Sequence, residues 1–341
     1  MSQSVPKHSS AAEVAVVLCT YNGTCYLDEQ INSLLAQEQS VSIFASDDLS
    51  SDGTAKRLSD LLRPEVDSLV IQASNQGYVR NFEATLNRAL ESGASYIALS
   101  DQDDIWEKGR VACGMRKMAE LERNHGMNVP LLIHSDLRLI DADGRLLHQS
   151  FLAFRHYRIN SHRNLGIILG ENGVMGNTVL MNQAMAKLCL PFPDQLHVHD
   201  YWIALLAELY GHRAMLDVPM VNYRLHTQNA SNTASSMRKG YQAVLSNATW
   251  KKLWSRDFKL PFKEDTRLHT LNNLLDNAEK FPDLDVDDWK QMESFRHYLN
   301  FKQSRLRSFS YLLESDMVRK GFLFRLRLFA VIMLTSRYPR K

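Results

Sequence analysis

Two hydrophobic patterns alternate along the first hundred residues of the chain. Residues 14–19 form a continuous apolar run with the length of a buried strand. After a polar turn, apolar side chains recur at helical spacing at Leu27, Ile31, Leu34 and Leu35. The chain therefore begins with a predicted strand, turn and helix.

The same pattern then repeats. Apolar runs at 41–45, 68–72 and 96–99 predict three more strands, and a helix is predicted from about Thr54 to Leu62. Strands that alternate with helices predict an α/β fold, with a mostly parallel central sheet and helices on both faces.

Two acidic motifs follow strand-like runs about fifty residues apart, Asp47 to Asp52 and Asp101 to Asp104. In open α/β sheets, ligands bind in the crevice where strands end. Crowded carboxylates supply the hard oxygen ligands that suit Mg²⁺ or Mn²⁺ carrying a phosphate. If the strand continues, residues 101 and 103 point to the same side and share one cation. The alternative is a solvated turn in which Asp104 is a helix N-cap.

Four segments in order resemble the motifs of family 2 glycosyltransferases of the GT-A (nucleotide-diphospho-sugar transferase) fold. They are VVLCTYNG at 16–23, SDDLSSDGT at 46–54, NQGYVRN at 75–81 and LSDQDDIW at 99–106. The resemblance extends more loosely through 170–177, 199–202 and 223–229. It implies a sugar-nucleotide donor and transfer with inversion.

The resemblance also implies roles on the donor side. The residues expected to bind the nucleotide are Thr20, Tyr21, Asn22, Asp48, Asn75 and Arg80. Asp48 would accept a hydrogen bond from the imide N–H of uracil or thymine, since a carboxylate suits that donor. The planar fork of Arg80 would approach the base or the diphosphate; otherwise Arg80 is a surface arginine capping a helix.

A metal role is implied for the second acidic motif. Asp103 would be the principal ligand of Mg²⁺ or Mn²⁺, with Asp101 closer to the donor ribose or sugar and sharing the metal's field. Late in the chain, His226 would bring a neutral imidazole to the metal or a charged one to the diphosphate, and Arg224 would share the phosphate contact. The cation would neutralise the leaving nucleoside diphosphate.

Asp200 resembles the family's catalytic carboxylate, which takes the proton from the acceptor hydroxyl. The family more often has Glu just before this Asp, and here His199 stands in that place. The alternative for Asp200 is an N-cap of a helix over 201–209, which is compatible with catalysis.

Length and composition agree with an enzyme. The 341 residues, 45% of them hydrophobic, fit a polar tail at 1–12, a GT-A catalytic domain at 13–236 and a helical C-terminal extension at 237–341. A formal charge of +2 gives no field that favours nucleic acid. Four cysteines without paired metal spacing and an N-terminus without an apolar stretch predict reduced thiols in a cytoplasmic protein.

The last segment is distinct. Residues 319–341 hold seven Lys or Arg and no acid, around an apolar run from Phe322 to Leu334. Such a segment is too short and charged to span a bilayer, but suits peripheral contact with an anionic membrane surface. The alternative is a core-docked final helix with a basic outer face.

Together these features predict a glycosyltransferase that moves a sugar from a UDP- or dTDP-sugar to a hydroxyl of a growing bacterial surface glycan. The motif variants most resemble rhamnosyltransferase-type members that build lipopolysaccharide or O-antigen, with a glycan or lipid-linked oligosaccharide as acceptor. Two alternatives stay open. A metal-dependent phosphoesterase or nucleotidyltransferase would use the same acids, and a non-catalytic relative would bind sugar nucleotides without turnover.

Overall fold

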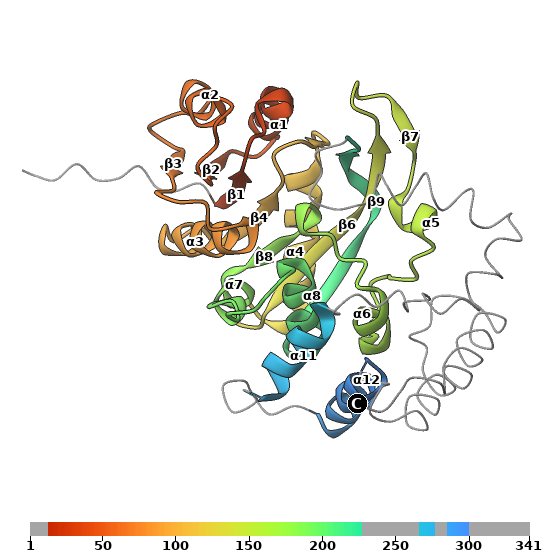
Figure 1. Cartoon of the computed structure of the whole chain (residues 1–341). Coiled ribbons are helices and arrows are strands. Elements are labelled where there is room, and N and C mark those ends of the chain that lie inside the picture. Colours follow the sequence, from red (N-terminus) through yellow and green to blue (C-terminus); the bar gives the residue numbers. More distant parts are fainter. Residues whose placement is uncertain (1–12, 227–265, 277–284, 300–341) are drawn as a thin grey trace, which may run out of the picture.

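The computed structural model of the chain describes residues 13–226, 266–276 and 285–299 (Figure 1). The predicted tail at 1–12 and the basic segment at 319–341, with its predicted membrane contact, lie outside these residues. Among the described helices, none combines the length and apolar character needed to cross a membrane.

Four parallel strands form the first half of the sheet. They are β1 (Val14–Thr20), β2 (Val41–Asp47), β3 (Ser68–Ile71) and β4 (Tyr96–Ser100). Every residue of β1 is buried, which explains its continuous apolar run. The connecting helices are α1 (Thr24–Leu35), α2 (Thr54–Leu61) and α3 (Tyr78–Glu91). Figure 1 shows α1 and α2 on one side of these strands and α3 on the other.

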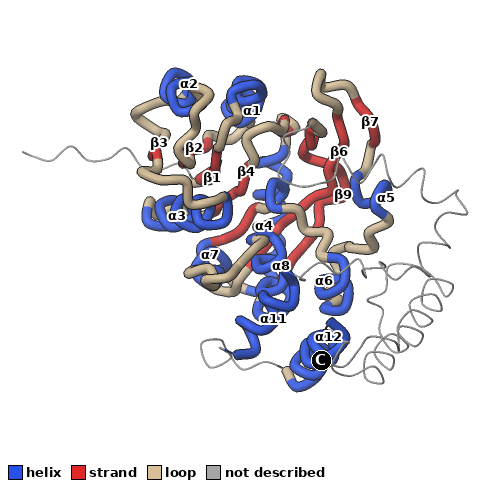
Figure 2. The backbone as a smooth tube through the Cα atoms, in the orientation of Figure 1, coloured by secondary structure: helices blue, strands red, loops and turns tan. Residues whose placement is uncertain are grey.

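The sheet continues through strands of both directions, in the order β3-β2-β1-β4-β8-β6-β9-β5. The short strand β8 (Leu180–Asn182) is antiparallel to both β4 and β6 (Leu131–Ile140), whereas β9 (His212–Arg224) is parallel to β6. Two further short strands, β5 (Ile105–Trp106) and β7 (Leu146–His148), pair with β9 and β6. The predicted α/β fold with a mostly parallel sheet is confirmed. Figure 2 shows the strands in red with helices around them.

The remaining helices cover the second half of the sheet and its end. They are α4 (Arg110–His125), α5 (Phe151–Arg155), α6 (Leu165–Glu171), α7 (Gln183–Cys189), α8 (His199–Tyr210), α11 (Thr266–Asp276) and α12 (Val286–Leu299), with a 3-10 turn at Gly176–Thr178. Helix α12 packs on α11 and α6, where Met292 is fully buried and Asp288 pairs with Arg163.

One conditional prediction and two alternatives from the sequence are wrong. Strand β4 ends at Ser100, so residues 101 and 103 are not alternate positions of one strand. Asp104 caps no helix, because Ile105 and Trp106 pair with β9 as a strand. Helix α8 begins at His199 with Val198 as its N-cap, so Asp200 lies in the first turn. For Asp104, the pairing of Ile105 and Trp106 with β9 replaces the helix that the local pattern allowed.

The register brings the motif-bearing strand ends together. Thr20 of β1 pairs with Asp47 of β2, and Leu18 of β1 pairs with Ser100 of β4. Because these strands are parallel, both acidic loops leave the sheet at the same edge.

Candidate functional site

The first acidic loop is held by a dense set of hydrogen bonds. The carboxylate of Asp47 accepts from Thr20 Oγ1 at 2.8 Å, from Ser50 N at 2.8 Å and from Ser50 Oγ at 2.6 Å. Burial alone would raise the pKa of Asp52, but hydrogen bonds from Thr54 and Thr24 lower it below its ordinary value. The negative charges of this loop are therefore satisfied within the protein.

Asp48 is 2% exposed, and its two oxygens accept from the backbone N–H groups of Gln76 (2.8 Å) and Gly77 (2.9 Å). Gly77 has φ +81°, a conformation that glycine adopts without strain, and this geometry turns its N–H toward the carboxylate. The side chain of Asn75 donates to the Asp48 carbonyl at 3.2 Å. Asp48 thus joins the β2 end to the loop before α3. Further acceptance from a base stays a prediction, which the second lone pair of each oxygen permits.

The second acidic loop is electrostatically different. Burial and the negative charges of Asp103 and Asp200 raise the pKa of Asp101 to about 7. Burial thus disfavours the charged form of Asp101, and the carboxylates of Asp101 and Asp200 lie close enough for their charges to repel.

Asp103 is 9% exposed and contacts His226, with 2.8 Å between Oδ2 and the imidazole Nε2. The His226 ring also lies against Tyr26, with 4.8 Å between ring centroids. The structure therefore brings together two of the predicted metal-site residues that are more than 120 positions apart in sequence.

Asp104 is fully buried behind this pair. Its carboxylate accepts from the Asn177 side chain and, at 3.2 Å, from the Arg224 backbone N–H. Burial and the charges of Asp103 and Asp101 raise its pKa well above the ordinary value. The buried Arg110 lies under the same loop, where burial lowers its pKa to about 9 while Asp104 and Asp101 oppose that shift. Arg110 is thus a buried cation beneath these acids.

Arg224 supports the loop rather than facing the crevice. Its guanidinium is 1% exposed and donates to the carbonyls of Asp103 and Ala142, both at 3.0 Å, and to the carboxylate of Glu29. The guanidinium carbon lies 4.6 Å from the centre of the Tyr26 ring. The predicted phosphate contact of Arg224 would require these contacts to break.

The described residues enclose a cavity of about 260 Å³ and another of about 230 Å³, and each would accommodate a ligand of modest size. Asp103 of the second acidic loop lines the latter. The latter, here called the donor cavity, is lined by Tyr21, Asn22, Gly23, Cys25, Tyr26, Gln102, Asp103 and His226. It joins the turn after β1 to the second acidic loop.

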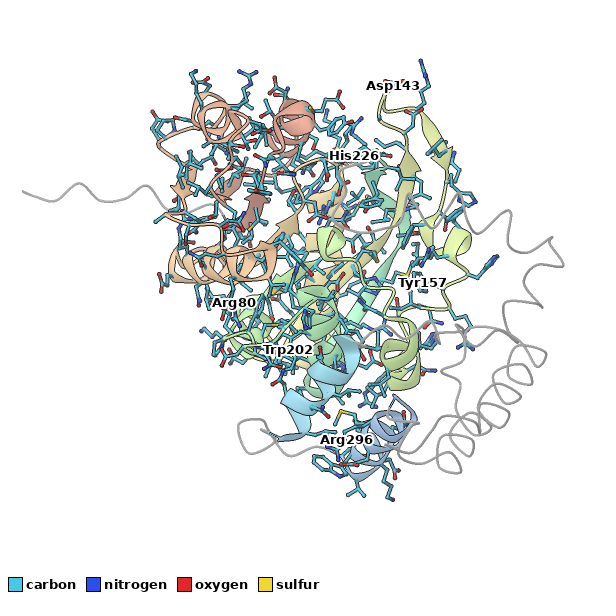
Figure 3. All side chains as sticks on the ribbon, viewed as in Figure 1. Arg80, Asp143, Tyr157, Trp202, His226 and Arg296 are labelled. Carbon is cyan, nitrogen blue, oxygen red and sulfur yellow. The ribbon has the colours of Figure 1, made fainter. Side chains whose placement is uncertain are left out.

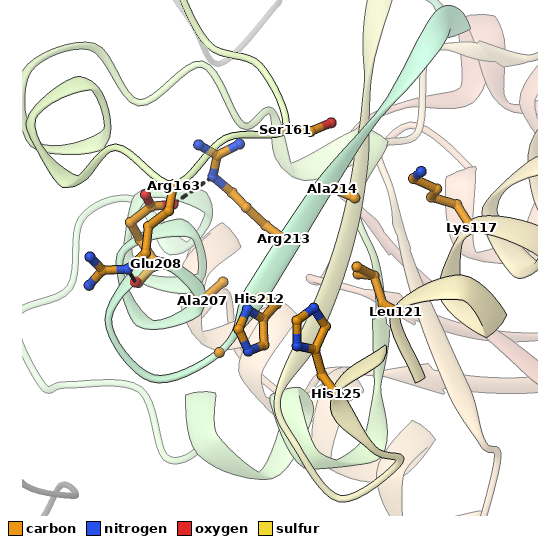
Figure 4. Close-up of a pocket in the computed structure, with 11 residues that line it drawn as sticks. Lys117, Leu121, His125, Ser161, Arg163, Ala207, Glu208, His212, Arg213 and Ala214 are labelled. Carbon is orange, nitrogen blue, oxygen red and sulfur yellow. Dashed lines mark hydrogen bonds and ion pairs between the residues drawn. The ribbon is translucent and has the colours of Figure 1, made fainter. Parts of the chain in front are cut away.

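The larger cavity lies elsewhere, at the start of β9 (Figure 4). Its cations already have partners: Arg213 pairs with Glu208, and Arg163 pairs with Asp288. The rings of His125 and His212 stack there with centroids 3.6 Å apart. Strand β9 begins at His212, and the second acidic loop lies beside the last residue of β9, Arg224. The larger cavity and the acids are therefore at opposite ends of β9.

The second acidic loop fits a divalent cation in charge and ligand type. Asp101 and Asp103 supply hard oxygens, and a cation would favour the charged form of Asp101, which burial and the charges of Asp103 and Asp200 disfavour. Within the described ranges, no group of three or more His, Cys, Asp or Glu side chains is arranged to hold a metal. A bound cation would thus need oxygens from the donor diphosphate and water.

Asp200 lies across from the acids, in the first turn of α8. Burial raises its pKa to about 6, while backbone N–H groups of Tyr201 and Gly176 lower it. The Asn172 side chain lies 3.5 Å from its Oδ1. A carboxyl with this pKa is ionised at neutral pH and is more basic than a free one.

His199 adds no charge beside Asp200. Its ring stacks on Phe82, with centroids 4.3 Å apart, and burial lowers its pKa to about 4. An added Cβ on Gly176 would lie 3.1 Å from His199 Nε2, so the loop before β8 packs closely on this ring. The histidine that replaces the family's usual Glu is therefore a neutral packing residue.

Arg80, which was predicted to bind the donor, lies away from the second acidic loop. Its guanidinium pairs with Glu83 and donates to the carbonyls of Phe192 (3.2 Å) and Pro193 (2.8 Å). Figure 3 shows Arg80 and His226 well separated. Arg80 here fixes the loop after α7, and its donor contact stays a prediction.

Comparison with known proteins agrees with this geometry. Residues 15–127 match the model of the family described as glycosyl transferase family 2. The chain is 35% identical over 98 residues to dTDP-rhamnosyl transferase RfbG of Shigella flexneri, a match that covers 28% of this chain and 34% of that protein. The aligned part thus spans about a third of the relative's length.

The fold is similar to that of S. aureus TarS. The structure of TarS residues 1–349 in complex with UDP-GlcNAc has a TM-score of 0.51 and 16% identity, and covers 96% of this chain and 93% of that one. The same TarS fragment with UDP gives a TM-score of 0.50 over the same shares. Residues 15–127 thus match glycosyl transferase family 2, and the chain as a whole shares its fold with the glycosyltransferase TarS.

Sequence reasoning missed three residues near the acids: Gln102, Arg110 and Asn177. Gln102 and Asn177 lie inside motif-like segments, but their residue types gave no sign of their partners. Arg110 follows a motif by four positions, and an isolated arginine at a helix start carries no signal of burial. These roles depend on tertiary contacts.

Proposed function

We propose that this glycosyltransferase moves a sugar from a dTDP- or UDP-linked donor to a hydroxyl of a growing bacterial surface glycan, with inversion at the anomeric carbon. The name of the S. flexneri relative, a dTDP-rhamnosyl transferase, favours dTDP-rhamnose as the first donor to test. Uracil and thymine share the imide N–H, so the UDP-linked donors stay in the same proposal.

One observation supports this proposal most strongly: Asp101 and Asp200 lie close enough for the charge of Asp200 to act on Asp101, and their pKa values are raised to about 7 and about 6. The two carboxylates differ in their surroundings. Asp101 belongs to a loop that lines the donor cavity, whereas Asp200 lies in the first turn of α8. Groups with pKa values shifted by burial and by each other are typical of catalytic sites.

The arrangement suits a single displacement. The acceptor oxygen forms its bond to the anomeric carbon as the bond from that carbon to the diphosphate breaks. The proton of the acceptor hydroxyl passes to the carboxylate of Asp200, and the nucleoside diphosphate leaves. One base on the acceptor side is enough for inversion.

Asp103 and Asp101 would hold a Mg²⁺ or Mn²⁺ ion, which when bound neutralises charge on the leaving diphosphate. The other residues orient this pair. His226 contacts Asp103, and Arg224 fixes the loop carbonyl of Asp103 from beneath. Arg110 limits the charge repulsion among the acids without entering the crevice.

A metal-dependent phosphoesterase would use the same carboxylates but transfer to water at phosphorus. The match to the family 2 model over 15–127 favours transfer of a sugar instead. The products separate the two: the transferase releases dTDP or UDP from the donor, whereas the phosphoesterase releases phosphate.

The deciding experiment is a screen of sugar nucleotides with Mn²⁺ and with Mg²⁺. We expect dTDP or UDP to raise the melting temperature in the presence of metal, and a dTDP- or UDP-sugar to be hydrolysed slowly to the nucleoside diphosphate. Release of phosphate alone, or absence of any nucleotide effect, would contradict the proposal.

A further inference from the structure

The side chain of Gln102 joins the two loops that line the donor cavity. Its Oε1 accepts from the backbone N–H of Tyr21 at 2.8 Å, and its Nε2 donates to the backbone carbonyl of the same residue at 3.1 Å. The amide thus pairs with one peptide unit as a neighbouring strand would. Gln102 itself lies between Asp101 and Asp103.

Gly23 leaves the space that this amide occupies. A Cβ at position 23 would lie 2.2 Å from Gln102 Oε1 and 2.4 Å from Cδ, far inside contact distance. The backbone of Gly23 has φ −111° and ψ 10°, which an alanine also adopts. A side chain at position 23 would therefore displace the Gln102 amide, while the backbone conformation itself would accept it.

The three residues of this contact, Tyr21, Gly23 and Gln102, all line the donor cavity together with Asp103 and His226. Tyr21 and Gly23 belong to the turn after β1, and Gln102 belongs to the second acidic loop. A shift of one loop relative to the other would change the width of the cavity and the position of the Asp103 carboxylate.

We propose that Gln102 is a positioning residue for the donor: its two hydrogen bonds to Tyr21 hold the acidic loop at the distance that a nucleoside diphosphate requires. This inference rests on the proposed function. Glutamine suits the role because it is neutral, has both a donor and an acceptor, and reaches the peptide. A glutamate would place a second oxygen against the Tyr21 carbonyl.

The contact gives a specific expectation for paired substitutions. Gln102→Met removes both hydrogen bonds while keeping side-chain length, and Gly23→Ala expels the amide from the same place. Since both variants break one contact, the double variant should be no worse than either single one. Gly109→Ala is the matched control: Gly109 also precedes a helix, with φ −90° and ψ 8°, and its added Cβ would meet only Cys113 Sγ at 3.9 Å.

The experiment is a titration of the full-length protein and its variants with dTDP and UDP in the presence of Mn²⁺. We expect Kd to rise about tenfold in Gln102→Met, in Gly23→Ala and in the double variant, and to stay within about twofold in Gly109→Ala. Binding stoichiometry should not change, because a positioning defect weakens binding without lowering the folded fraction.

Three results would overturn the inference. The first is an unchanged Kd for the nucleotide in Gln102→Met. The second is a lower binding stoichiometry at constant Kd. The third is a Kd about a hundredfold higher in the double variant than in the wild type, which would mean that the two substitutions act independently. If the wild type binds neither nucleotide, the proposed function fails. The same double-mutant cycle in urea unfolding then still decides whether Gly23 and Gln102 are coupled.

Discussion

The two acidic loops place the same kind of side chain at the same edge of the sheet, yet their charges are handled in opposite ways. In the first loop, Asp47 and Asp48 accept hydrogen bonds from hydroxyls and backbone N–H groups, and the pKa of Asp52 is lowered. In the second, the pKa values of Asp101 and Asp104 are raised.

The difference lies in the neighbours. Donors surround the first loop, so its carboxylates accept several hydrogen bonds each and hold the backbone in shape. Other carboxylates surround the second. Two buried arginines lie beneath it: Arg224, which donates to the Asp103 carbonyl, and Arg110, whose pKa is lowered to about 9 by burial. Charge left unbalanced in a crevice indicates where a ligand supplies the missing cation, whereas balanced charge indicates a structural loop.

The largest expected effect comes from breaking the second loop. Asp103→Ala should abolish sugar transfer and metal-dependent donor binding, because it removes the principal oxygen ligand proposed for the cation. Unfolding in urea should stay cooperative, since the carboxylate supports no core contact beyond His226. Donor turnover by HPLC tests this. Full activity of the variant, or wild-type activity undiminished in excess chelator, would rule out the metal role.

The next effect concerns the acid on the acceptor side. Asp200→Asn keeps the size of the side chain but removes the proton acceptor, so transfer should fall by about 10²- to 10⁴-fold while dTDP or UDP binding is retained. Measuring both kcat and the Kd for dTDP or UDP separates a loss of catalysis from a loss of nucleotide binding. A near-normal rate would assign the base to another residue.

Features of the two loops that depend on local pattern could be predicted from the sequence, whereas features that depend on tertiary contacts could not. The strand ends and their acidic loops were located because buried strands and amphipathic helices have simple periodicities. The contrast between the loops could not be predicted, because Thr20, Gly77 and Arg110 reach the acids only through folding. Gln102 shows the same limit, since an amide in a motif does not reveal which peptide it pairs with.

A smaller effect should appear in the pH dependence of transfer. Burial raises the pKa of Asp200 to about 6, and the base acts only when deprotonated. The transfer rate should therefore fall about tenfold per pH unit below pH 6 and level off above it. A rate profile from pH 5 to 8, at saturating donor, tests this. A plateau that extends unchanged down to pH 5 would contradict the assignment.

The smallest effect is on stability, and it has opposite signs in the two loops. Asp47→Asn should destabilise by about 1 to 3 kcal/mol, because its new amide would face the hydroxyl and N–H donors of Thr20 and Ser50. Asp101→Asn should instead stabilise the chelator-treated protein at pH 8, by about 1 kcal/mol, because it removes a charge that burial and other acids disfavour.

The sign of the Asp101 effect follows from proton binding. The folded-state pKa of about 7 lies above the ordinary 3.8, so the folded wild type binds more protons between these values than the unfolded chain does. The wild type must therefore lose stability as pH rises from about 4 to about 7, a loss that Asp101→Asn avoids. Urea unfolding at pH 4 and pH 8 should give a variant advantage only at pH 8. An equal gain in stability at pH 4 and pH 8 would mean that the charge of Asp101 does not distinguish the second loop from the first.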